Sequence, residues 1–180
     1  KLLVASGGRP NPLRVPGAEG TGGIYNFQTL DEAKAISARI ERSKHAVTLG
    51  GSFIAYELTE AFRHRGLATT WLIRGPRFLH RIIDEGGGAL IDKLARDVGV
   101  DTRYGEQASE VQAVDGEVAS VTTLKGTHFD CDLLGVGLGL TLRTEFLKGT
   151  PVEVGAGVVT NEYLETNVPD VFAAGDVAEF

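Results

Sequence analysis

The feature that constrains this chain most is a β-α-β pattern packed into about 30 residues. Residues 45–49 (HAVTL) form an apolar run that leads into the turn GGS, and residues 53–65 carry apolar side chains at helical spacing up to Gly66. Residues 68–73 (ATTWLI) form a second apolar run. A β-α-β unit is right-handed and places its two strands in parallel. The chain is therefore predicted to build an α/β fold.

The rest of the chain extends this pattern with two helices and a meander. Helical spacing predicts helices at residues 31–43, with Asp31 as the N-cap, and at residues 89–98. The apolar period then falls to two, which predicts antiparallel strands at residues 110–114, 118–124 and 128–137. We expect a Rossmann-like, three-layer domain in which a three-stranded antiparallel meander covers one side of a parallel sheet.

Composition excludes several classes of protein. The net charge of −6 leaves no broad basic surface for nucleic acid. No apolar run is long enough to cross a bilayer, so we expect a cytoplasmic protein without a membrane partner. The single cysteine, Cys131, cannot form an internal disulfide or a CxxC pair and is interpreted as a small buried apolar residue. No metal site is expected.

The segment Val47–Glu57, VTLGGSFIAYE, carries the chemical signal. A pyrophosphate needs backbone N–H donors, which the start of a helix offers together with the positive end of its dipole. Gly50 and Gly51 make the turn, Ser52 takes the usual place of the second glycine of GxGxxG, and Ala55 takes the third. Because a strand precedes this turn and a helix follows it, a dinucleotide site is favoured over a turn that binds nothing.

Two expectations follow for this turn. The hydroxyl of Ser52 offers a further hydrogen-bond donor to a phosphate oxygen. A Gly50→Val substitution is expected to abolish dinucleotide binding without unfolding the domain, because its side chain would fill the space of the phosphates.

The second strand of the unit bears on the choice of cofactor. It ends in Ile73 instead of the acid that accepts the ribose hydroxyls of NAD. Arg74 and Arg77, with His80 and Arg81 nearby, offer guanidinium groups to the 2′-phosphate of NADP. The sequence therefore favours NADPH over NADH. The alternative, that both arginines are solvated loop charges, stays open.

Three stretches together resemble the pyridine nucleotide-disulfide oxidoreductase superfamily, and most closely its ferredoxin- and rubredoxin-reductase-like branch, with relatives of apoptosis-inducing factor. KLLVASGGRP is similar to the strand and turn where such chains leave the FAD domain. TLGGSFIAYE is similar to the GGGxIGxE signature of the inserted NAD(P) domain, and NVPDVFAAGDVAEF to the segment that returns to the flavin.

The resemblance implies roles for individual residues. On the nicotinamide side, Phe53 and Ile54 would flank the nicotinamide, Glu57 would lie near its carboxamide, and Gly137 would pass beneath the dinucleotide. On the flavin side, Asp176 would bind a ribityl hydroxyl, Gly175 would allow close approach, and Ser6, Gly7 and Arg9 would lie near FAD.

The resemblance also implies a domain division and a function. Residues 1–23 and 147–180 would be pieces of an FAD domain, and residues 24–146 the NAD(P)-binding domain. The family's N-terminal GxGxxG motif is absent, so we expect a fragment with an incomplete FAD site that is inactive alone. The expected whole is an FAD-dependent oxidoreductase that passes hydride from NAD(P)H to flavin and electrons to a ferredoxin- or rubredoxin-type carrier. Alternatives are a dinucleotide-sensing module without turnover, and an NAD(P)H oxidase or disulfide reductase.

Overall fold

A computed structural model describes all residues, Lys1 to Phe180. The chain forms two compact units. One is continuous, Asn11–Gly139, and the other combines Lys1–Pro10 with Leu140–Phe180. No helix is long and apolar enough to cross a membrane.

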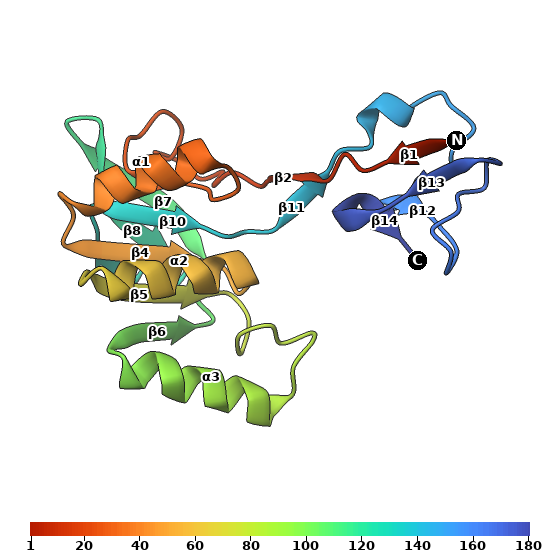
Figure 1. The fold of residues 1–180 in the computed structure, drawn as a ribbon. Coiled ribbons are helices and arrows are strands. Elements are labelled where there is room, and N and C mark those ends of the chain that lie inside the picture. The colour runs from red at the N-terminus through yellow and green to blue at the C-terminus, as the bar shows by residue number, and fades with distance from the viewer. The chain divides into compact units, whose positions relative to one another are not determined.

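The continuous unit is built on a five-stranded parallel sheet in the order β3-β10-β4-β5-β6 (Figure 1). Val47 of β4 pairs with Thr70 of β5 on one side and with Leu134 of β10 on the other. The predicted neighbours HAVTL and ATTWLI therefore do lie side by side. The strands are β3 (Ile24–Tyr25), β4 (His45–Leu49), β5 (Ala68–Ile73), β6 (Val100–Tyr104) and β10 (Leu133–Val136).

Helices cover one face of this sheet and an antiparallel meander covers the other (Figure 1). Alternate residues of β10 face the two layers: Leu133 packs among the helices, and Leu134 packs against the meander. The predicted three-layer α/β fold is confirmed. The covering elements are α1 (Leu30–Ile40), α2 (Phe53–His64), α3 (Glu85–Asp97), β7 (Ala108–Val114), β8 (Glu117–Thr123) and β9 (His128–Asp130).

Two helices begin earlier than the sequence indicates. The N-cap of α1 is Thr29, not Asp31, because Thr29 and Glu32 form a reciprocal capping box in which the Thr29 hydroxyl accepts from the Glu32 N–H. Helix α3 begins at Glu85 despite three glycines in its first turn, because the side chain of Asp84 accepts a hydrogen bond from the Gly87 N–H at 2.8 Å.

The expected single strand 128–137 is two strands in two different sheets. The carboxylate of Asp132 accepts hydrogen bonds from the N–H groups of Lys44 and His45, and its carbonyl accepts two from the guanidinium of buried Arg39. These bonds divert the chain from the meander into the parallel sheet. Cys131 lies at this junction and is buried, as predicted, and burial raises the pKa of its thiol to about 12.

The second unit consists of short strand pairs around a small core. Near the two ends of the chain, β1 (Leu2–Val4) and β13 (Val171–Ala173) pair in parallel. The other pairs are β2 (Gly8–Pro10) with β11 (Leu140–Leu142), and β12 (Val158–Val159) with β14 (Ala178–Glu179). Two 3-10 turns complete it, η1 (Glu145–Leu147) and η2 (Gly175–Val177).

Candidate functional site

The glycine turn lies at the carboxyl edge of the parallel sheet, between β4 and α2. From β4 the chain proceeds outward through β5 to β6 and then returns to β10 on the opposite side of β4. The strand order therefore reverses at β4. In open α/β sheets, ligands bind outside the carboxyl ends of the strands at such a reversal.

The start of α2 offers backbone donors at this edge. Ser52 is the N-cap, and the N–H groups of Phe53 and Ile54 have no partner within the helix. The third N–H, that of Ala55, is satisfied by the Ser52 hydroxyl at 3.3 Å. Two N–H groups and the positive end of the helix dipole therefore face the carboxyl edge, as an anion requires.

The small residues of the turn are required by the protein itself. Gly50 has a φ of +119°, and a Cβ there would overlap the carbonyl oxygen of Gly137. A Cβ on Gly137 would in turn lie 2.7 Å from the backbone nitrogen of Ala55. We therefore expect Gly50→Val to destabilise the domain as well as block binding, because the added side chain meets protein before it meets any phosphate.

Ser52 has a structural role that the sequence did not indicate. Its hydroxyl donates to the carbonyl of Gly137 at 2.9 Å, across 85 residues of sequence. A hydroxyl has one hydrogen to donate, so this bond replaces the expected donation to a phosphate oxygen. The hydroxyl instead ties the start of α2 to the end of β10.

Arg74 and Arg77 follow β5 in very different environments. Arg74 is exposed and forms no ion pair or hydrogen bond within the protein. Arg77 donates to the carbonyls of Ile83 and His80 at 3.2 and 3.3 Å. Its side chain also packs on α3, since a Cβ on Gly88 would lie 2.7 Å from its Cδ. Arg77 therefore stabilises the loop between β5 and α3. The guanidinium of Arg74, by contrast, has no partner within the protein.

An aromatic cluster holds this loop against α2. Phe78 lies 5.4 Å from Trp71 and 6.0 Å from Phe53, measured between ring centroids. Trp71 also donates its indole N–H to the carbonyl of Gly50 at 2.7 Å. Sequence reasoning missed this support of the turn, although Trp71 is the only tryptophan in the chain. Ile73, which replaces the usual acid, is buried beside it.

The remaining residues assigned to the nicotinamide side lie on the first turns of α2. Phe53 is 61% exposed, and its ring forms an edge-to-face pair with that of Phe78 at an interplanar angle of 84°. Ile54 is half-buried, and Glu57 lies one turn further along the helix and is exposed. Gly51 packs against Ile73: a Cβ added to Gly51 would lie 3.2 Å from Cγ2 of Ile73.

The residues assigned to the flavin side belong to the second unit. The Ser6 hydroxyl donates to the Arg143 carbonyl at 2.7 Å, and Arg9 forms an ion pair with Glu145. The other three have open surroundings: Gly7 and Gly175 at positive φ with nothing within 4 Å of an added Cβ, and Asp176 on the exposed turn η2.

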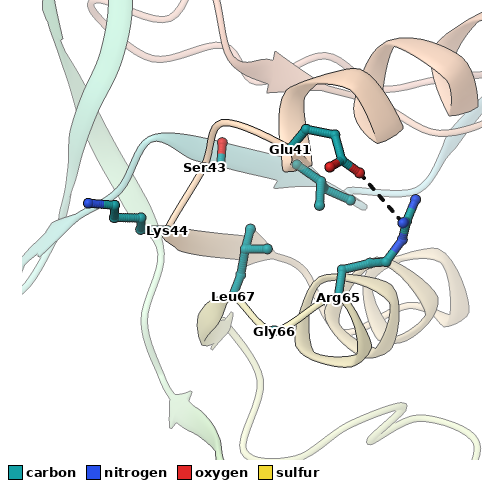
Figure 2. Close-up of a pocket in the computed structure, with 7 residues that line it drawn as sticks. Glu41, Ser43, Lys44, Arg65, Gly66 and Leu67 are labelled. Carbon is teal, nitrogen blue, oxygen red and sulfur yellow. Dashed lines mark ion pairs between the residues drawn. The ribbon is translucent and has the colours of Figure 1, made fainter.

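A pocket of about 420 Å³ lies at the opposite edge of the sheet (Figure 2). The segments that follow α1 and α2 form it, and Glu41 and Arg65 face each other there as an ion pair at 3.6 Å. Because β4 and β5 begin at this edge, the pocket lies away from the glycine turn. It does not contribute to the candidate site.

The family model for pyridine nucleotide-disulphide oxidoreductases matches residues 1–180 of the chain. The chain belongs to this family. The resemblance inferred from the three sequence stretches is therefore confirmed. The chain is 32% identical to putidaredoxin reductase from Pseudomonas putida, over 100% of this chain and 44% of that protein.

Solved structures show the same fold. A ferredoxin reductase from Rhodopseudomonas palustris matches 98% of the chain with a TM-score of 0.92 and 29% identity, over 44% of its own length. An engineered water-forming NADPH oxidase bound to NADPH matches 99% with a TM-score of 0.87 and 27% identity, over 39% of its length. The chain thus spans less than half of the proteins that it resembles.

Proposed function

We propose that the Asn11–Gly139 unit binds a nicotinamide dinucleotide, as part of an FAD-dependent oxidoreductase. The observation that carries the proposal is the start of α2. There, the free N–H groups of Phe53 and Ile54 lie at the carboxyl edge of the sheet, where the strand order reverses. These donors suit a pyrophosphate.

Each part of this edge has a task in the proposal. The backbone of residues 51–54 holds the pyrophosphate, and Phe53, Ile54 and Glu57 position the nicotinamide. Gly137 keeps the floor of the site free of side chains. When both cofactors are bound, the nicotinamide supplies a hydride and FAD accepts it. The protein's own contribution is to align the two rings and exclude water, and no side chain acts as an acid or base.

For the choice of cofactor, we propose NADPH with Arg74 at the 2′-phosphate. Ile73 cannot accept a hydrogen bond from a ribose hydroxyl, and Arg74 is unengaged. The engineered NADPH oxidase supports this proposal, because its substitutions replace an aspartate by alanine and the adjacent alanine by arginine. Here an apolar residue and an arginine stand side by side at the end of β5.

For the flavin side, we propose that the unit formed by residues 1–10 and 140–180 is part of an FAD-binding domain, with boundaries at the ends of the Asn11–Gly139 unit instead of at residues 23 and 147. Gly175 and Asp176 present an open turn for a ribityl hydroxyl, and Gly7 leaves room for close approach. Ser6 and Arg9 contribute by holding the Arg143–Glu145 segment through the contacts described above.

For the acceptor, we propose a ferredoxin-type electron carrier, since the ferredoxin reductase has the highest TM-score among the structures compared above. Oxygen is the second candidate, because the engineered oxidase has a similar fold. Anaerobic mixing of the full-length protein with NADPH tests the shared step. Loss of flavin absorbance within the dead time of manual mixing is expected. Slow or absent reduction by both NADPH and NADH would favour a nucleotide-sensing module. Oxygen consumption with and without added ferredoxin then separates the two acceptors.

A further inference from the structure

A cluster of hydrogen bonds fastens together the two points where the chain enters and leaves the Asn11–Gly139 unit. At its centre is Asn26, which directly follows β3 and is half-buried. Its side-chain nitrogen donates to the carbonyl of Asn11 and to the carbonyl of Val136, both at 3.1 Å. An amide nitrogen carries two hydrogens, and both are used here.

Asn11 completes the cluster. Its backbone N–H donates to the carbonyl of Gly139 at 2.9 Å, and its side-chain nitrogen donates to the carbonyl of Leu138 at 3.2 Å. Gly139 adopts a φ of +85°, which suits a sharp change of chain direction. We call these bonds among Asn11, Asn26 and residues 136–139 the crossing clasp.

The clasp supplies hydrogen bonds at the point where the pairing between β3 and β10 ends. Tyr25 pairs with Gly135, but β3 ends there while β10 continues to Val136. The side chain of Asn26 satisfies the Val136 carbonyl where the ladder has ended. The next residue, Gly137, accepts the bond from Ser52 at the start of α2. The bond from Asn26 to Val136 is therefore one residue away from Gly137, which borders the proposed pyrophosphate site.

We propose that Asn26 is a positioning residue for hydride transfer, an inference that rests on the proposed function. The two crossings at Asn11 and Gly139 are the covalent connections between the unit that would hold the nicotinamide and the rest of the chain. Bonds that hold both crossings in one direction would limit the freedom of this unit during hydride transfer. A misplacement of reacting groups by about 1 Å can cost a hundredfold in rate. Asn26 touches no reacting atom and acts through the main chain at Asn11 and Val136.

Asn26→Leu tests this role in the full-length flavoprotein, because leucine is similar in size but donates no hydrogen bond. We expect the limiting rate of anaerobic flavin reduction to fall about tenfold or more, while the dissociation constant of the nucleotide changes less than about twofold. Ser109→Ala is the matched control, since it removes one side-chain bond to a carbonyl, that of Thr122, in the meander. The control is expected to reduce flavin at the wild-type rate.

A readout that needs no cofactor accompanies the kinetics. In Asn26→Leu, the amide hydrogen of Asn11 should exchange with solvent at least about tenfold faster than in the wild type. If neither nucleotide reduces the flavin of the wild-type protein, the proposed function fails. The exchange rate of the Asn11 amide hydrogen then still shows whether Asn26 holds the crossing at Asn11 in place. The inference is overturned if Asn26→Leu reduces flavin at the wild-type limiting rate, whether or not its nucleotide affinity is weaker. It is also overturned if Ser109→Ala loses the same amount of rate. If Asn26→Leu does not fold, Asn11→Ala, which removes the side-chain bond to the Leu138 carbonyl, is judged by the same criteria.

Discussion

The turn after β4 and the loop after β5 flank the same edge of the sheet but are constrained in opposite ways. In the turn, Gly50 and Ser52 both contact Gly137, and Trp71 holds the carbonyl of Gly50. In the loop, Arg74 extends from the end of a buried strand without any partner. The fingerprint residues therefore hold the turn in shape through contacts within the protein, whereas Arg74 is free to contact a ligand, as the proposed reading of the 2′-phosphate requires.

The largest expected effect is the loss of stability when the turn is altered. Gly50→Ala should destabilise the protein by roughly 2 to 5 kcal/mol, because it combines a forbidden φ with overlap of the Gly137 carbonyl. Denaturant unfolding measures the change. Gly51→Ala is the matched control, with ordinary φ and a 3.2 Å contact to Ile73, and it should cost less than about 1.5 kcal/mol. Equal stability of the two variants would show that the turn tolerates a side chain at Gly50.

The next effect separates the two arginines of the loop. Arg74→Ala should leave stability unchanged and weaken NADPH binding about tenfold or more, since a charge-assisted hydrogen bond contributes about 1.5 to 3 kcal/mol. NADH affinity should stay within about twofold. Arg77→Ala should instead destabilise the protein by about 1 to 2 kcal/mol, through lost bonds to the Ile83 and His80 carbonyls. Titrations with both nucleotides and unfolding curves check the pair. If NADH binds as tightly as NADPH, or if Arg74→Ala weakens both alike, Arg74 does not read the 2′-phosphate.

A smaller effect is expected from the hydroxyl of Ser52. Ser52→Ala removes the cap on the Ala55 N–H and the bond to Gly137, and should cost about 1 to 2 kcal/mol of stability. Ser52→Gly, which restores the usual fingerprint residue, should cost less as an N-cap but still lose the bond to Gly137. A tenfold or greater loss of nucleotide affinity in Ser52→Ala without loss of stability would instead show that the hydroxyl binds a phosphate oxygen.

The sequence predicted what depends on local pattern. The β-α-β unit, the meander on one face and the position of the glycine turn all follow from apolar period and turn residues. The split of residues 128–137 at Asp132 did not, because it depends on bonds to Lys44 and His45, far away in sequence. The start of α3 was missed because glycines disfavour a helix, and the cap at Asp84 outweighs them.

The candidate site was predicted in outline and misread in detail for the same reason. Gly50 and Ser52 were recognised from the fingerprint, but their partner Gly137 directly follows β10, more than 80 residues further along the chain. The sequence pattern alone also assigned Arg74 and Arg77 the same role, as ligands of the 2′-phosphate. Only the folded loop, in which Arg77 bonds to His80 and Ile83, distinguishes them.

A pair of substitutions at Phe53 tests directly whether backbone N–H groups at the start of α2 bind the pyrophosphate, as proposed. Phe53→Pro removes one of these N–H groups at the first helical position, where proline is tolerated, and the extended backbone of Ser52 suits a following proline. Phe53→Ala keeps the N–H and removes the same ring. Calorimetric titration of both variants with NADPH should show binding about tenfold or more weaker in Phe53→Pro than in Phe53→Ala. Equal affinities in two folded variants would contradict the claim.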